Sequence, residues 1–178
     1  KNSDWVFRAL AELVRNRPSS QLKIIAMEYG PDIEAIKSLV KELNLEKYVF
    51  WLPKTERRKI MAILERCALG IGEFYKEKVI WGGTGWECFA SGKPLVQGYF
   101  WGSGEYERCF GHPAPPLYAA TDINGILAAF TDVLDNPSRA HTKGLASKVW
   151  FDEHSGHRLA KRWLSLISDP SQSGEENL

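Results

Sequence analysis

Short strand-like segments alternate with helix-like segments along almost the whole chain. Five apolar segments of strand character begin near residues 22, 48, 69, 94 and 117, and each of the first three gaps between them holds a segment of helical character. A spacing of about 21 to 27 residues between strands is typical of right-handed βαβ units, which form a parallel sheet with helices on both faces. We therefore predict an α/β fold, a Rossmann-like three-layer domain with a parallel sheet of about five to six strands.

Polar residues at the starts of the helical segments predict where the helices begin. Asp4 precedes a segment whose apolar residues share one face, Thr55 precedes a second, and Thr121 or Asp122 precedes a third. Residues 98–115 contain many glycines and prolines and are expected to be irregular. Further helices are expected over 84–91, about 138–153 and about 156–167.

The composition narrows the class of protein. The chain has 178 residues, close to one ordinary domain, and 44% of them are hydrophobic, so it can build a core without disulfides or a structural metal. Its formal net charge of +1 lacks the basic excess that nucleic-acid-binding proteins normally carry. No apolar run approaches the length of a membrane span, and no secretory leader precedes the first helical segment. We expect a cytoplasmic protein without a nucleic-acid partner.

The cysteines and the end of the chain bear on metal binding and on domain limits. Cys67, Cys88 and Cys109 form no CxxC or CxxH pair, so we expect reduced thiols and no metal site.

The chain ends in SGEENL, whose last three letters match the start of a common protease-tag site. We expect residues 1–168 to form the domain and residues 169–178 to be a tail that includes an expression scar.

One glycine-rich loop stands out among the loops that follow the predicted strands. In an open parallel sheet ligands bind at the carboxyl ends of the strands, and WGGTGWE, residues 81–87, lies in such a loop directly before a helix. A helix N-terminus offers free N–H groups and a partial positive charge, which suit a phosphate, and Glu87 falls one turn into the helix, within reach of sugar hydroxyls. The alternative is a tight turn in which Glu87 only caps the helix.

Two common phosphate-binding motifs are missing from the sequence. The chain has no GxxxxGK followed by Ser or Thr, and no GxGxxG follows its first predicted strand. These absences disfavour an ATP-type P-loop and a dinucleotide-binding site.

The segment GWECFASGKPLV, residues 85–96, resembles the block LEAMACGKPVV of GT-B glycosyltransferases similar to family 4. Shorter likenesses extend over about residues 1–165, including the strand and loop at 24–32, the segment 43–52 and the helix at 121–137. The resemblance implies the C-terminal half of a GT-B fold, whose active site lies in the cleft between two Rossmann-like halves. It also implies that this half binds a nucleotide-sugar donor, UDP-, GDP- or ADP-linked, and that the N-terminal half, which holds the acceptor, is missing here.

The resemblance assigns roles around the glycine-rich loop. Glu87 matches the second Glu of the family's E-x7-E motif, which accepts hydrogen bonds from the donor ribose. Gly82, Gly83 and Thr84 match the backbone segment whose amides approach the diphosphate.

The resemblance also assigns roles outside that loop. Leu52, Pro53 and Lys54 match the loop that contacts the base, and Lys1 matches a basic residue that neutralises donor phosphate, unless it is only an exposed terminal residue. Lys54 belongs to a basic cluster that either attracts a diphosphate or an anionic membrane surface, or is a solvated charged face. The other members of that cluster are Arg57, Arg58 and Lys59.

The sequence departs from the family pattern in two places. The first Glu of E-x7-E should stand at position 79, which is Val79; Glu77 fits only with a two-residue insertion, and Glu73 lies at a strand end. We assign Glu77 as the sugar-contacting Glu, with a solvated loop residue as the alternative. The usual Gly-Gly pair after the fourth strand is replaced by an aromatic stretch, 99–105, which either stacks on a sugar or base or fills a gap.

These observations predict a glycosyltransferase donor-binding domain, inactive alone, that belongs to an enzyme of the retaining type. We expect no metal and no cofactor, and the expected partners are the nucleotide-sugar donor and the N-terminal acceptor domain. Peripheral association of the full-length enzyme with the inner face of the membrane is left open. Two alternatives also remain: a GT-B sugar-nucleotide epimerase and a non-catalytic α/β interaction module.

Overall fold

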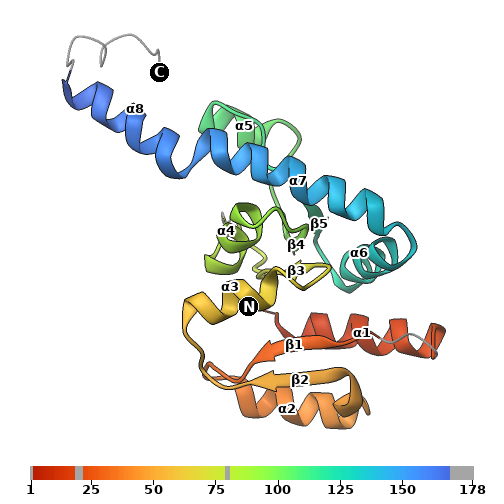
Figure 1. The fold of residues 1–178 in the computed structure, drawn as a ribbon. Coiled ribbons are helices and arrows are strands. Elements are labelled where there is room, and N and C mark those ends of the chain that lie inside the picture. The colour runs from red at the N-terminus through yellow and green to blue at the C-terminus, as the bar shows by residue number, and fades with distance from the viewer. Residues whose placement is uncertain (1, 19–21, 79–80, 169–178) are drawn as a thin grey trace.

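The computed structural model describes residues 2–18, 22–78 and 81–168. Helices and strands alternate as predicted, and each strand begins within about two residues of its expected position (Figure 1). Lys1, Val79 and the predicted tail 169–178 lie outside the described residues. The elements are α1 (Asp4–Asn16), β1 (Ile24–Met27), α2 (Ile33–Glu42), the 3₁₀ turn η1 (Glu46–Tyr48), β2 (Val49–Leu52), α3 (Arg57–Leu64), β3 (Gly70–Ile71), α4 (Gly83–Ala90), β4 (Leu95–Gly98), α5 (Glu105–Phe110), β5 (Tyr118–Ala120), α6 (Ile123–Asp135), α7 (Pro137–His154) and α8 (Gly156–Ser168).

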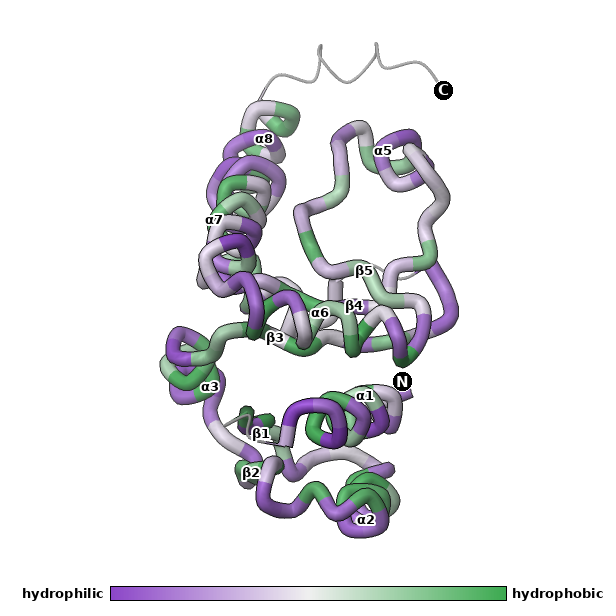
Figure 2. The backbone as a smooth tube through the Cα atoms, turned by 90° about the vertical axis from the view of Figure 1, so that its right-hand side faces the viewer, coloured by the Kyte–Doolittle hydropathy of each residue, from purple (hydrophilic) through white to green (hydrophobic). Residues whose placement is uncertain are grey.

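All strand pairs in the described part of the chain are parallel, but they form two sheets and not the single sheet expected from the sequence. β1 pairs with β2 in one sheet, and β4 lies between β3 and β5 in the other. Figure 2 shows the two sheets apart from each other, with β1 and β2 in the lower part of the view. β3 has only two residues, and the Gly70 and Gly72 amides donate to Pro94 O and Val96 O at 2.9 and 2.8 Å. Such a short strand offers β1 little edge to pair with, so a cavity separates the two sheets.

Helix α1 connects the two sheets through a shared core. Its buried face packs against α6 on one side and contacts α2 on the other. The core cluster contains Ile24 and Val49 from the first sheet together with Val96 and Ala120 from the second. The sheet is interrupted, but the apolar core that drives folding is continuous.

The predicted helix starts are partly confirmed. Asp122 caps α6, because its carboxylate accepts a hydrogen bond from the Gly125 amide at 2.8 Å. The predictions for Asp4 and Thr55 are wrong. Asp4 is the first helical residue of α1 and pairs with Arg8 one turn on, at 3.2 Å. The Thr55 hydroxyl donates to Pro53 O at 2.6 Å, so the chain turns once more before α3 begins.

The segment 98–115, predicted to be irregular, contains the short helix α5. Gly104 and Gly111 flank this helix with φ values of +65° and +71°, a left-handed conformation that glycine adopts without a Cβ clash. The abundance of glycine that indicated an irregular loop therefore marks the two ends of a helix.

An aromatic cluster holds α4, α5 and α7 together. Trp150 of α7 is buried, its ring meets Trp81 edge to face at 6.2 Å, and its indole N–H donates to Pro113 O at 2.7 Å. Trp81 also meets Phe89 of α4 edge to face, at 5.4 Å. We use the name aromatic cluster for Trp81, Trp86, Phe89, Tyr99, Trp101, Tyr106, Phe110, His112, Trp150, Phe151 and His154.

Two stacked histidines lie at the edge of the aromatic cluster. The rings of His112 and His154 are 3.9 Å apart with 12° between their planes, and His154 is the last residue of α7. Burial, and after it the proximity of His112, lowers the pKa of His154 from its ordinary 6.5.

Folding stability is expected to fall as the pH drops below about 6.5. Because the pKa of His154 is lowered in the folded state, the unfolded chain binds the proton more tightly. The stabilisation is present above the unfolded-state pKa and is lost as the pH falls through the folded-state pKa. Thermal melting between about pH 7.5 and pH 5.5 checks this, and His154→Gln should have a shallower pH dependence than the wild type. The exposed His157→Gln serves as control, and equal slopes for His154→Gln and wild type would contradict the account.

Candidate functional site

A cavity of about 1280 Å³ lies between β1 and β3 and reaches the carboxyl ends of β1 and β2. Met27 and Leu52 line it at those strand ends, while Thr84 and Glu87 line it from α4. Apolar side chains of α1, α3 and α6 form much of the remaining wall. The volume exceeds the roughly 300–1000 Å³ of ordinary small-ligand pockets. The cavity brings three of the predicted site residues together: Leu52, Thr84 and Glu87.

The glycine-rich segment forms the N-terminus of α4. Gly82 is the N-cap residue with an extended backbone, Gly83 and Thr84 form the first turn, and both are exposed. A Cβ added to Gly83 would meet no atom within 4 Å, so the approach to this helix end is open. The first N–H groups of a helix have no partner within the helix and carry a partial positive charge. This end of α4 can therefore accept a phosphate group.

Gln97 fixes the position of this helix end against β3. Its buried side chain lies between Gly72 and Gly85: a Cβ on Gly72 would come within 2.3 Å of Gln97 Oε1, and one on Gly85 within 3.3 Å of the same atom. A side chain at Gly72 would require the Gln97 side chain to move, and one at Gly85 would press closely against it. The glycines bring the start of α4 close to the strand end.

Glu87 lies one turn inside α4 and is largely buried. Only 14% of its side chain is exposed, and its Oε1 lies 3.1 Å from Nε of Arg57, the first residue of α3. The carboxylate thus connects the helix that follows β2 with the helix that precedes β4. Arg57 was foreseen only as one of four basic residues, because its pairing with Glu87 depends on the tertiary fold.

The predicted base-contacting loop follows directly from β2. Leu52 ends the strand at the cavity, whereas Pro53 and Lys54 are exposed. The Lys54 ammonium lies 5.8 Å from the ring centre of Tyr29, which follows β1. The loops after β1 and β2 therefore meet beside the cavity.

Glu77 and Glu73 are the two candidates for the first Glu of the E-x7-E motif, and their surroundings differ. Glu77 is exposed, in the segment that precedes α4. Glu73 is half-buried just beyond β3, and a Cβ built on Gly82 would lie 3.2 Å from its Oε2. The structure places Glu73, which the sequence left as the second choice, beside the α4 N-terminus.

The aromatic residues after β4 pack within the chain. Tyr99 stacks on Trp81 with ring centroids 6.4 Å apart, and Trp101 meets Tyr106 edge to face at 5.6 Å. Of the two interpretations of this stretch, packing accounts for these two rings.

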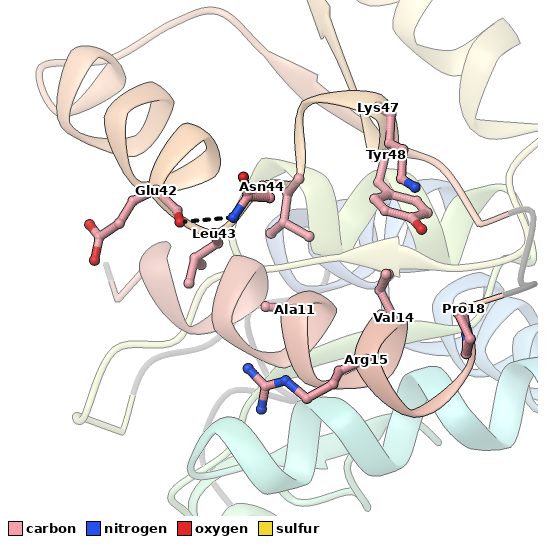
Figure 3. Close-up of a pocket in the computed structure, with 10 residues that line it drawn as sticks. Ala11, Val14, Arg15, Pro18, Glu42, Leu43, Asn44, Lys47 and Tyr48 are labelled. Atoms are coloured by element: carbon pink, nitrogen blue, oxygen red, sulfur yellow. Dashed lines mark hydrogen bonds between the residues drawn. The ribbon is translucent and has the colours of Figure 1, made fainter.

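A second pocket, of about 470 Å³, lies between α1 and the segment from α2 to η1 (Figure 3). Figure 3 shows Arg15, Glu42 and Lys47 at its wall with the Tyr48 ring, and Asn44 donating to Glu42 O at 3.5 Å. None of the predicted site residues is among the ten that line it.

The described part of the chain holds neither a metal-binding cluster nor a membrane-spanning helix. Across 2–18, 22–78 and 81–168, no group of three or more His, Cys, Asp or Glu is arranged to hold a metal ion. No helix in these ranges is long and apolar enough to cross a bilayer.

The chain is an α/β domain with a cavity at the carboxyl ends of its strands, and the proteins to which it is similar are GT-B glycosyltransferases. The GDP-mannose-dependent alpha-(1-6)-phosphatidylinositol monomannoside mannosyltransferase of Mycolicibacterium smegmatis is 26% identical over 184 aligned positions, which cover 94% of this chain and 44% of that protein. No family model matches the chain.

Solved structures show the same fold. HepE of Anabaena, in complex with UDP and glucose, has a TM-score of 0.71 at 15% identity and covers 94% of this chain and 45% of its own. Staphylococcus aureus TarM, in a complex that contains UDP, has a TM-score of 0.70 at 19% identity, and the match covers 95% of this chain and 33% of the TarM chain. Sucrose-phosphate synthase of Thermosynechococcus elongatus has a TM-score of 0.66 at 16% identity, and the match covers 95% of this chain and 43% of the synthase chain.

The comparisons confirm the resemblance that the sequence indicated. The chain has the Rossmann-like fold of one half of a GT-B glycosyltransferase. It spans less than half the length of the mannosyltransferase and of each of these solved chains.

Proposed function

We propose that this chain is the nucleotide-sugar-binding half of a retaining glycosyltransferase, and that it corresponds to the C-terminal half of the GT-B fold. One observation carries the proposal: the open N-terminus of α4 and the Glu87 carboxylate one turn further on lie at one cavity at the strand ends. This arrangement offers amide donors to a diphosphate and an anionic acceptor to the hydroxyls of the adjoining ribose.

The named ligands of the similar proteins support the same class of substrate. HepE and TarM were solved with UDP, and the mannosyltransferase is named for GDP-mannose. We propose a donor linked to a nucleoside diphosphate and leave uracil, guanine and adenine to be decided by titration. Leu52, Pro53 and Lys54 are the residues proposed to contact the base.

The chemistry of transfer follows from this placement. When the glycosyl group leaves the donor, negative charge develops on the departing diphosphate, and the α4 amides point to that charge without needing to reorganise. Neither a metal nor a cofactor is part of the proposal. Because the acceptor is proposed to bind to a second domain, the chain alone should bind donor without transferring sugar.

Calorimetric titration of the folded chain with GDP, UDP and ADP tests this proposal. We expect one of the three to bind, and to bind more tightly than its own nucleoside, because the α4 N-terminus acts on the phosphates. No binding of any of the three up to millimolar concentration would contradict it. Product analysis of the full-length enzyme would then separate glycosyl transfer from epimerisation.

Glu73 and Glu77 provide a matched pair for locating the sugar subsite. We expect Glu73→Gln to weaken binding of the nucleotide sugar about five- to twentyfold while the nucleoside diphosphate is little affected, because Glu73 lies beside Gly82 where the sugar would follow the diphosphate. Glu77→Gln should change neither, because Glu77 is exposed. Calorimetry with both ligands measures the two effects. The opposite ranking of the two variants would return the role to Glu77.

A further inference from the structure

Arg57 contacts the proposed ribose-binding carboxylate directly. Its Nε lies 3.1 Å from Glu87 Oε1, and the two side chains are 75% and 14% exposed. Arg57 begins α3, which follows β2, and Glu87 belongs to α4, which precedes β4. The ion pair therefore joins α3 to α4 at the cavity that Glu87 lines.

Stability alone does not explain this pair. The Arg57 side chain is mostly exposed, so solvent screens its attraction to Glu87 and the pair adds little to folding stability, and a cation at the first position of α3 meets the unfavourable end of the helix dipole. The neighbouring Lys59 pairs within its helix with Glu56, at 4.0 Å. Arg57 is the member of the basic cluster whose ion pair reaches the cavity.

The contact has a geometric effect on Glu87. A glutamate side chain turns freely about its last bond, and a guanidinium on one oxygen restricts that rotation. With Oε1 held by Arg57, the orientation of Oε2 is set before a ligand arrives. A preorganised acceptor costs less entropy when it receives hydrogen bonds from vicinal hydroxyls.

We propose that Arg57 is a positioning residue, which orients the Glu87 carboxylate toward the 2′- and 3′-hydroxyls of the donor ribose. The inference rests on the proposed function, since it concerns the same nucleotide site. It differs from a role in binding phosphate, because Arg57 acts through Glu87 and its effect depends on the ribose hydroxyls.

The experiment compares a nucleotide with its dideoxy counterpart. GDP and 2′,3′-dideoxy-GDP, or the matching UDP pair if the wild type prefers uracil, are titrated calorimetrically into wild type, Arg57→Gln, Glu87→Gln and the double variant. Arg57→Gln should weaken binding of the ribonucleotide about five- to tenfold and leave the dideoxynucleotide unchanged. In the Glu87→Gln background, Arg57→Gln should have no further effect, because the two residues act as one unit.

Two further variants and three contrary outcomes sharpen the test. Arg57→Lys should restore part of the affinity, and the exposed Arg58→Gln should behave as wild type. Equal losses for both ligands would overturn the proposal in favour of a direct contact with the diphosphate. Wild-type affinity in Arg57→Gln would overturn it in favour of a surface ion pair. A wild type that binds neither nucleotide would overturn the proposed function itself, and this inference with it.

Discussion

Replacing Trp150 with alanine is expected to lower the free energy of unfolding by about 3–5 kcal/mol. Trp150 is only 6% exposed, meets Trp81, Trp86 and Phe89 within the aromatic cluster, and donates to Pro113 O at 2.7 Å. Its removal leaves a large void beside Trp81 and the α4 rings of Trp86 and Phe89. It also leaves the carbonyl of Pro113 without this hydrogen bond.

Chemical denaturation measures the effect, and a second tryptophan provides the control. Trp163 of α8 is 60% exposed, so Trp163→Ala should change the free energy of unfolding by less than about 0.5 kcal/mol. Trp150→Phe should lie between the two alanine variants, because it keeps most of the ring contacts and loses the indole N–H. A Trp150→Ala change below about 1 kcal/mol would show that the aromatic cluster does not hold α7 in place.

Replacing Glu87 with alanine is expected to weaken nucleoside diphosphate binding by about 1–3 kcal/mol, roughly 5- to 150-fold. The reason is the loss of a charged acceptor at a largely buried position, one turn from the proposed diphosphate site. Since the rest of the cavity is unchanged, the loss should appear in affinity and not in stability.

Calorimetry on the variant and a matched control distinguishes this effect from a general loss of charge. Glu65 is an exposed glutamate at the end of α3, and Glu65→Ala removes the same charge without a place at the cavity. The control should bind as the wild type does. If Glu65→Ala and Glu87→Ala lose equal affinity, the carboxylate has no specific role.

Local patterns in the sequence were sufficient to predict most of the fold. The apolar segments predicted the positions of the five strands, and the spacing of the strands predicted that they are parallel. The features that the local patterns did not predict depend on the length of one strand and on tertiary contacts. The separation of the two sheets follows from a β3 of only two residues, Gly70–Ile71, whose pairing is confined to β4. The helix α5 was missed because its two flanking glycines indicate a loop in sequence alone.

The candidate site was predictable where it depends on a contiguous motif. The segment from Gly82 to Glu87 forms the start of one helix, as its glycines and its likeness to the family indicated. The contact of Arg57 with Glu87 joins residues 30 positions apart, and no local pattern marks which of four basic residues makes it. The choice between Glu73 and Glu77 likewise depends on which carboxylate the chain folds back toward Gly82.

The most direct test of the central claim is a residue-resolved one. The claim is that a nucleoside diphosphate binds at the N-terminus of α4, so its addition to the ¹⁵N-labelled chain should shift the amide NMR signals of Gly82, Gly83 and Thr84 most strongly, with saturation. Glu87→Ala should shift the saturation point to higher concentration. Saturable shifts that spare these amides and gather instead at the pocket of Arg15 and Tyr48 would contradict the claim.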